Sequence, residues 1–212
     1  MNSAATARIE IVTPSGPAWA DIDRPPTELA GPTALMVLGH GAGGGVDAPD
    51  LVAVRDAATA AGIVVARVTQ PYRVAGRRAP APAARLDEAW LCAITAITGQ
   101  PGLAELALVV GGRSSGARVA CRTAAHTGAR AVVSLAFPVH PPGKPERSRL
   151  DELALPGTRV LVVQGDRDPF GMPPKARGRT LVVIAGADHS LRKDPAGVAA
   201  AVVDFVVGVS VS

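Results

Sequence analysis

Apolar and polar positions follow two different patterns along the chain, which predict strands and helices in turn. Residues 7–13 alternate with a period of two, and the turn residues 14–17 lead into 18–23, so we expect a hairpin. Short continuous apolar runs predict further strands, typical of a sheet covered on both faces. These runs cover 34–38, 63–68, 106–110, 131–137, 160–164 and 181–184.

Segments with helical periodicity lie between these runs. Residues 85–97 are the best amphipathic helix, and we expect others from Asp47 or a neighbouring residue, with Asp as N-cap, to Gly62, and after the run 106–110 as far as Gly128. A last helix is predicted to bury one stripe, which consists of Val198, Ala201, Val202, Phe205 and Val206. Residues 74–84, rich in arginine, proline and alanine, predict a loop.

This alternation of strands and helices predicts an α/β fold, in which a mostly parallel, doubly wound sheet carries helices on both faces. The chain has 212 residues and neither an internal repeat nor a linker, so we expect a single domain over residues 1–212. Open sheets of this class place their functional groups at the carboxyl ends of the strands. Candidate chemistry is therefore sought where each predicted strand ends.

One predicted strand, 106–110, runs into the pattern Gly-x-Ser-x-Gly at Gly112–Gly116. Strand, sharp turn and small-residue helix form a nucleophile elbow, in which the turn strains the serine backbone and lifts its hydroxyl above the sheet. A Cβ at either glycine would collide with the neighbouring strand or helix. We therefore predict Ser114 as a nucleophile, the alternative being a purely structural turn, and expect Arg113 to point away from it.

An acid and a histidine follow the last two predicted strands. A serine hydroxyl needs a base within hydrogen-bond reach, and that base needs an orienting acid; α/β-hydrolases arrange them along the chain as Ser, Asp, His. We predict His189 as the base and Asp168 as the acid. Asp168 lies further along its loop than Asp166, which we expect to cap the turn. Asp188 adjoins the histidine, and adjacent side chains point apart.

The glycine-rich loop Gly39–Gly45 is the second element that an acyl-transfer site needs. The oxyanion of a tetrahedral intermediate takes two backbone N–H donors, one from the residue after the nucleophile and one from such a loop. We predict the N–H groups of Ala42 and Ser115 as these donors, with Gly43 as the second choice in the loop. His40 is expected to fix the loop rather than to act as a base.

The same loop also matches a dinucleotide-binding pattern, Gly-x-Gly-x-x-Gly, at Gly39, Gly41 and Gly44. The next strand ends without the acidic residue that would hold a ribose, and the loop follows a third strand rather than opening the fold. A dinucleotide site also leaves the serine, the aspartate and the histidine unexplained. A dinucleotide-binding oxidoreductase is therefore the less favoured alternative.

Composition and charge exclude several classes. The net charge is +4, but the arginines are scattered apart from Arg73, Arg77 and Arg78, so nucleic-acid binding is not predicted. No apolar run reaches the roughly 18 residues of a membrane span, and the first residues lack a signal-peptide pattern, so we expect a cytoplasmic protein without a membrane partner. Cys92 and Cys121 are isolated, which predicts neither a disulfide nor a metal site, and no cofactor is expected.

Two further stretches resemble those of a known family. One is Pro71-Tyr72-Arg73 with Ala75–Arg78 and Pro80, and the other runs from Phe137 to Pro145 and on to Gly165 and Asp168–Gly171. With these motifs the chain resembles the small, lidless α/β-hydrolases described as dienelactone-hydrolase-like, and in particular the bacterial relatives of eukaryotic testis-expressed and non-specific-lethal-complex hydrolase-fold proteins. The resemblance extends from the glycine-rich loop to the last helix.

The resemblance implies the α/β-hydrolase fold and serine hydrolase activity. Dienelactone hydrolases use a cysteine where this chain has Ser114, so their specific activity is not implied. Only residues 140–157 lie where other members insert a cap domain, so we expect no cap. The pocket is then either shallow or closed by the loop at 73–78.

Four residues are candidates for substrate contact. Arg73 and Arg77 either form a buried pair that binds a substrate carboxylate or phosphate, or pair with carboxylates and pin their loop. His140 either lines the pocket or stiffens a proline-rich turn, and Gly43 lets the loop approach the substrate. The sequence thus predicts a hydrolase that cleaves a small ester or thioester through an acyl-enzyme. The alternative is a binding or scaffolding protein of the same fold with a silent triad.

Overall fold

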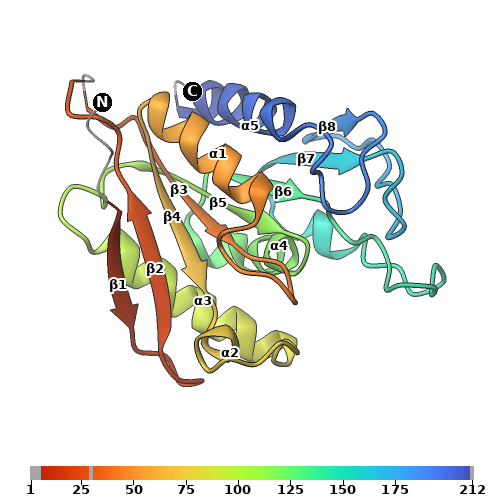
Figure 1. Cartoon of the computed structure of the whole chain (residues 1–212), viewed down its shortest axis with the longest axis horizontal. Helices are drawn as coiled ribbons and strands as arrows, with labels where there is room; N and C mark the ends of the chain where they lie inside the picture. The colour runs from red at the N-terminus through yellow and green to blue at the C-terminus, as the bar shows by residue number, and fades with distance from the viewer. Residues whose placement is uncertain (1–5, 29–30, 211–212) are drawn as a thin grey trace.

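An eight-stranded sheet forms the centre of the molecule (Figure 1). The computed structural model describes residues 6–28 and 31–210. The strands lie in the order β1-β2-β4-β3-β5-β6-β7-β8. Their bounds are β1 (Ala7–Ile11), β2 (Ala18–Asp23), β3 (Ala34–Gly39), β4 (Ile63–Thr69), β5 (Ala107–Arg113), β6 (Ala131–Leu135), β7 (Arg159–Gly165) and β8 (Arg179–Ile184). The hairpin strands β1 and β2 are antiparallel to their neighbours, and all other pairs are parallel.

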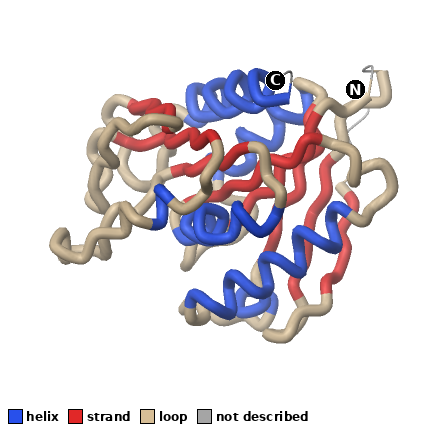
Figure 2. The backbone as a smooth tube through the Cα atoms, turned by 180° about the vertical axis from the view of Figure 1, so that it is seen from behind, coloured by secondary structure: helices blue, strands red, loops and turns tan. Residues whose placement is uncertain are grey.

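Helices cover both faces of this sheet, as the sequence predicts. They are α1 (Pro49–Ala60), α2 (Pro71–Val74), α3 (Ala83–Thr98), α4 (Ser115–Thr127) and α5 (Pro195–Ser210), with a 3₁₀ turn at Glu152–Ala154. Figure 1 shows α1 and α5 side by side on one face, and Figure 2 shows α3 and α4 on the opposite face. Each helix pair encloses its own buried apolar cluster against the sheet. The chain therefore has the three layers of a doubly wound α/β fold.

The central strand β3 explains why its sequence is apolar throughout. Every residue of β3 is buried, because β4 and β5 flank it and helices cover both faces. Its side chains alternate between the two apolar clusters, with Leu35 in one and Met36 in the other. β8 lies at the edge of the sheet and is only partly covered, so Val183 is exposed. The apolar runs thus identify the strands that lie between the two layers of helices. Because β3 and β5 are neighbours, the glycine-rich loop and Ser114 follow adjacent strand ends.

Several predicted element ends are wrong in detail. The N-cap of α1 is Ala48 rather than an aspartate, because Pro49 occupies the first turn, where its fixed φ suits the helix. The short helix α2 was not predicted; it too begins with a proline, Pro71. β6 ends at Leu135, since Ala136 has a positive φ of 47°. The prediction that Gly128 ends its helix is confirmed: its φ of 68° is left-handed.

The last helix buries a slightly different stripe from the predicted one. Val198, Val202 and Val206 are buried as expected, whereas Ala201 and Phe205 are only half-buried. Ala199 and Val209 complete the buried set instead. The buried stripe is therefore rotated toward α1, against which α5 packs.

No cap domain lies above the strand ends in the part of the chain that the structure describes. The segment between β6 and β7, where the sequence left room for none, contains only the 3₁₀ turn Glu152–Ala154. Within residues 6–28 and 31–210, no helix combines the length and apolarity needed to cross a membrane.

Candidate active site

Ser114 occupies a strained turn between β5 and α4. Its φ of 53° is positive, which is uncommon for a residue with a side chain, and its N–H donates to the carbonyl of Leu135 at 2.9 Å. The two flanking glycines are required by close backbone approach. A Cβ on Gly112 or on Gly116 would overlap the carbonyl oxygen of Gly39 in the neighbouring strand. The turn therefore has the backbone geometry that the sequence predicts for a nucleophile elbow.

The structure brings Ser114, His189 and Asp168 together, although they come from loops far apart in the sequence. Nε2 of His189 lies 2.9 Å from Oγ of Ser114, and its Nδ1 lies 2.8 Å from Oδ2 of Asp168. The carboxyl side chain of Asp168 is fully buried, whereas the His189 ring is partly exposed. Hydroxyl, imidazole and carboxylate thus form one hydrogen-bonded chain, the arrangement in which a base activates a serine and an acid orients the base.

Two hydrogen bonds besides the His189 contact fix the Asp168 carboxylate. The N–H of Phe170 donates to Oδ1 at 2.8 Å, and Nε2 of Gln164 donates to Oδ2 at 2.8 Å. Gln164 is fully buried, and its Nε2 also lies 3.1 Å from the carbonyl of Phe137 and 2.9 Å from that of Gly171, so three acceptors share its two N–H groups. Sequence reasoning missed Gln164, although a single amide in the otherwise apolar run 160–164 was a signal.

The neighbouring aspartates have other partners. Asp166 accepts a hydrogen bond from the N–H of Gly186 at 2.7 Å and so ties the two loops after β7 and β8 together. Asp188 accepts from both the N–H and the hydroxyl of Ser190, and these hydrogen bonds lower the pKa of its carboxyl. Neither aspartate forms a hydrogen bond with the imidazole of His189, whereas Asp168 does.

Arg113 and Phe170 both contact His189, and the sequence predicted neither contact. The Arg113 side chain, expected to point away from the nucleophile, donates from Nη2 to the carbonyl of His189 at 2.9 Å. Its Nε lies 2.9 Å from Oδ2 of the buried Asp50. The Phe170 ring lies against the imidazole, with a centroid distance of 4.1 Å. The histidine is therefore held from its backbone and from one ring face.

The glycine-rich loop packs directly against the elbow. A Cβ built on Gly41 would lie 3.7 Å from the Cβ of Ser114. The carbonyl of Ala42 accepts a hydrogen bond from the Tyr72 hydroxyl at 2.7 Å. Among the described residues, the N–H groups of Ala42 and Ser115 have no acceptor, so both remain available beside the serine.

The His40 ring holds the glycine-rich loop in place through two hydrogen bonds. The ring is buried; its Nδ1 lies 2.8 Å from the carbonyl of Gly41, and its Nε2 lies 3.1 Å from the N–H of Gln70. A carbonyl can only accept and an N–H can only donate, so the ring is neutral with its proton on Nδ1. Burial lowers the pKa of His40 and favours this neutral form.

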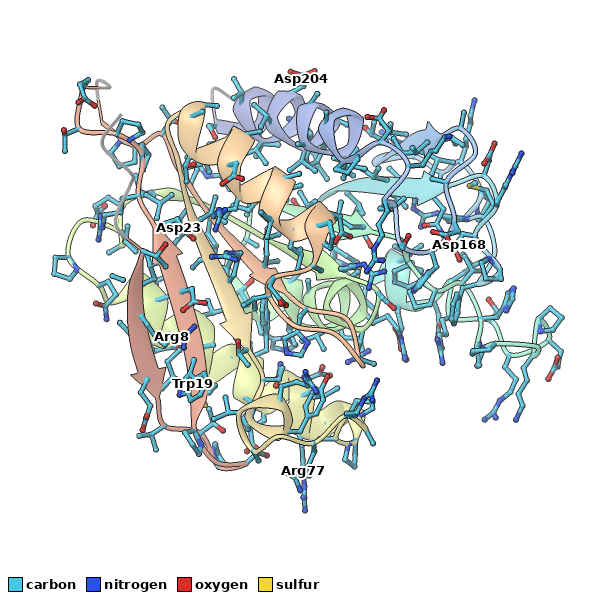
Figure 3. The ribbon with its side chains drawn as sticks, in the orientation of Figure 1. Arg8, Trp19, Asp23, Arg77, Asp168 and Asp204 are labelled. Carbon is cyan, nitrogen blue, oxygen red and sulfur yellow. The ribbon has the colours of Figure 1, made fainter. Side chains whose placement is uncertain are left out.

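The candidate substrate contacts are more dispersed. Arg73 is half-buried and donates to the carbonyl of Arg77 at 3.2 Å, which pins the loop without a carboxylate. Arg77 is exposed and points outward beside α2, well apart from Asp168 (Figure 3), so the two arginines do not form a buried pair. His140 packs against Gly171 and lies 2.9 Å from the carbonyl of Pro141. Gly43 has free space around its α-carbon.

The cysteines and the other possible metal ligands of the described residues form no metal site. Cys92 and Cys121 are both free thiols, half-buried and buried respectively. Burial raises the pKa of the Cys121 thiol to about 12. In the described part of the chain, no three His, Cys, Asp or Glu side chains are grouped so as to hold a metal ion.

The chain belongs to a family of α/β-hydrolases. A family model described as an alpha/beta hydrolase domain matches residues 32–198, which include the glycine-rich loop, the elbow and both loops that carry Asp168 and His189. Membership assigns the glycine-rich loop to this fold rather than to a dinucleotide-binding one. A comparison with curated protein sequences found no significant match.

Solved structures with the same fold include lidless hydrolases and esterases. An α/β serine hydrolase without a lid from Xanthomonas campestris is 21% identical, with a TM-score of 0.76 over 96% of this chain and 94% of that one. Est1E from Butyrivibrio proteoclasticus is 16% identical, with a TM-score of 0.78 over 97% and 99%. A dienelactone hydrolase from Anabaena variabilis is 18% identical, with a TM-score of 0.71 over 98% and 97%. The dienelactone-hydrolase-like, lidless fold expected from the sequence is thereby confirmed.

Proposed function

We propose that this protein is a serine hydrolase that cleaves a small ester or thioester through an acyl-enzyme. The observation that carries the proposal is the hydrogen-bonded chain from Ser114 through His189 to Asp168 on a strained elbow. A structural turn needs neither a partnered imidazole nor a buried carboxylate behind it. The geometry therefore supports acyl transfer better than a purely structural role.

The proposed reaction has two steps. Oγ of Ser114 attacks the carbonyl carbon while Nε2 of His189 takes its proton; the intermediate then expels the alcohol or thiol, which receives that proton. A water molecule next attacks the acyl-enzyme while Nε2 of His189 takes its proton; the second intermediate then releases the carboxylic acid, and the imidazolium returns the proton to Oγ of Ser114. Asp168 stays ionised and stabilises the imidazolium that forms in both steps.

The free N–H groups of Ala42 and Ser115 supply the oxyanion contacts. Both are backbone donors, so they need no reorientation when negative charge develops on the carbonyl oxygen. The Tyr72 hydroxyl holds the carbonyl of Ala42, and His40 holds that of Gly41, which fixes the direction of the loop. Gly43, Arg73, Arg77 and His140 stay candidates for substrate contact, although the exposed Arg77 points outward, away from this centre.

The structural relatives agree with ester chemistry. Est1E has also been solved with ferulic acid bound, a carboxylic acid of the kind that ester hydrolysis releases. No cap covers the described strand ends, so the acyl group of a substrate can reach Ser114 from an open surface.

Labelling with a fluorophosphonate probe, which reacts with activated serines, tests the proposal. We expect Ser114→Ala and His189→Ala to abolish labelling. Ser115→Ala is the matched control, because it keeps the backbone N–H, and it should still be labelled. Asp168→Asn should slow labelling by about 10⁴-fold, whereas Asp166→Asn, whose partner is Gly186, should change it little.

A wild-type chain that is folded but not labelled would overturn the proposal. The binding or scaffolding alternative would then be the better description of the fold. Labelled protein would next be assayed with short acyl esters and thioesters to define the acyl group.

A further inference from the structure

A basic cavity lies beside the first turn of α4, outside the hydrogen-bonded chain of the proposed active site. It has a volume of about 620 Å³ and lies against the segment that follows β6, which projects from the body of the molecule in Figures 1 and 2. Its lining consists of Arg118, Pro141, Pro142, Lys144, Arg147, Ser148 and Arg149. Four of these seven residues carry a positive charge, and none carries a negative one.

Most of this positive charge is not neutralised within the protein. Arg118 forms a two-point ion pair with Glu152, at 2.6 and 2.7 Å, and that carboxylate is shared with Arg122 at 3.3 Å. The ion pairs of the described residues leave Lys144, Arg147 and Arg149 without a carboxylate partner. Glu146 is the only acidic residue between Pro141 and Arg149, and it is exposed and unpaired.

Like charges converge on Arg149. Its side chain is half-buried, and burial, followed by the positive charge of Arg118, lowers the pKa of its guanidinium. The Glu152 carboxylate opposes this shift, whereas Arg147 and Arg122 add to it. Crowded cations beside a partly buried surface attract an anion, and guanidinium groups hold phosphate oxygens through paired N–H donors. The hydroxyl of Ser148, which accepts from the N–H of Leu150, still has its own proton to donate.

The cavity lies beside two parts of the proposed active site, the turn that carries Ser114 and the loop that carries Asp168. The N–H of Arg118 donates to the carbonyl of Ser114, so this wall lies one helical turn from the serine. On the other side, the N–H of Arg149 donates to the carbonyl of Val139 at 2.7 Å. Val139 in turn packs against Gly171, in the loop that carries Asp168.

We propose that this cavity binds a phosphate group carried by a small-molecule substrate, placing the ester or thioester carbonyl of that substrate at Ser114. Only the placement of the carbonyl at Ser114 rests on the proposed function; the binding of phosphate does not. A phosphate matches the site better than a carboxylate does, because it offers enough oxygens for several unpaired cations and a hydroxyl at once.

Binding is tested first, without turnover, by calorimetric titration of inorganic phosphate into the full chain carrying Ser114→Ala. We expect saturable binding that weakens as salt is raised. Arg147→Gln with Arg149→Gln should weaken it at least tenfold. The matched control, Arg130→Gln with Lys175→Gln, removes the same charge from exposed positions outside the cavity lining and should stay within twofold of the parent. Absence of saturable binding, or equal weakening in both double variants, would overturn the proposal.

The source of the phosphate is tested next. Two esters with the same acyl group are compared, one with a phosphorylated alcohol and one with the neutral alcohol. The cavity double variant should raise KM tenfold or more for the phosphorylated ester and leave the neutral ester unchanged. Equal effects on both esters would contradict the assignment, as would binding to anionic phosphatidylglycerol vesicles without binding of inorganic phosphate.

The two proposals fail separately. A wild-type chain that is not labelled by the fluorophosphonate but binds phosphate would overturn the proposed hydrolase function and support the anion site. A wild-type chain that is labelled but does not bind phosphate would overturn the proposed anion site and support the hydrolase function.

Discussion

Nη2 of Arg113 donates to the backbone carbonyl of His189 at 2.9 Å, although Arg113 immediately precedes Ser114 in the chain. The same guanidinium contacts Oδ2 of Asp50, a fully buried residue in the first turn of α1. Burial raises the pKa of the Asp50 carboxyl, and the Arg113 charge opposes that shift. One side chain therefore joins the strand of the nucleophile, the loop of the base and the first helix.

Arg113→Gln should affect stability and reactivity for different reasons. It leaves Asp50 buried without a cation, so the free energy of unfolding should fall by about 3–5 kcal/mol. It also frees the His189 loop, so fluorophosphonate labelling should slow by about 10–100-fold. Chemical denaturation and labelling rates measure the two effects.

The double variant Arg113→Gln with Asp50→Asn separates these effects. Removing the orphaned charge should recover most of the lost stability, while labelling stays slow because the contact with His189 is still missing. A double variant that regains the wild-type labelling rate would show that this contact does not position the histidine.

Gln164→Leu should mainly lower kcat. The substitution removes the donor to Asp168 and to two backbone carbonyls, so the carboxylate loses one of the groups that hold it toward His189. We expect kcat to fall about tenfold with a smaller change in KM, as for an interaction that acts on the reacting group. Gln100→Leu is the matched control, since that half-buried amide bonds only the carbonyl of Ala96. Equal losses of kcat in both variants would contradict a positioning role for Gln164.

The difference between Ser114 and Gln164 shows how far the sequence could predict this site. Ser114 lies in a Gly-x-Ser-x-Gly pattern that can be recognised from the local sequence, and its two glycines are those that the close approach to Gly39 requires. Arg113 acts through Asp50 and His189, which only tertiary packing brings near. Gln164 lies four residues before Asp168, but its contact with that carboxylate depends on how the loop after β7 folds back, which no spacing rule gives. The same holds for the fold: the fully buried β3 was read directly from its apolar run, whereas α2 is too short to show a helical period.

Acidification should destabilise the fold through His40. Burial holds the pKa of His40 below its ordinary value of about 6.5. The unfolded chain therefore takes up the proton more readily, so this contribution to stability is present above about pH 6.5 and is lost as the pH falls through the pKa of the folded state. Protonation would also remove the acceptor for the N–H of Gln70.

Urea denaturation between about pH 7.5 and pH 5 measures this contribution. The wild-type free energy of unfolding should decrease on acidification more steeply than that of His40→Gln, which carries no titrating group at this position. His126→Gln, at an exposed site in α4, should keep the wild-type slope. Parallel curves for wild type and His40→Gln would show that the buried ring does not contribute.

Gly116→Ala should loosen the junction between the elbow helix and β3. The new Cβ would overlap the carbonyl oxygen of Gly39 and lie 2.9 Å from that of His40, so α4 must move away from the strand. Overpacking of this kind costs about 1–3 kcal/mol, and it also displaces the N–H of Ser115 from the oxyanion position.

The matched control is the same substitution in another helix. Gly208 in α5 has nothing within 4 Å of a new Cβ, so Gly208→Ala should stabilise the helix by up to about 1 kcal/mol. Thermal unfolding should therefore move Tm in opposite directions for the two variants, with labelling slowed only in Gly116→Ala. A Gly116→Ala variant with wild-type Tm and labelling would mean that β3 and α4 can separate freely, and the close approach would then not be what the glycine provides.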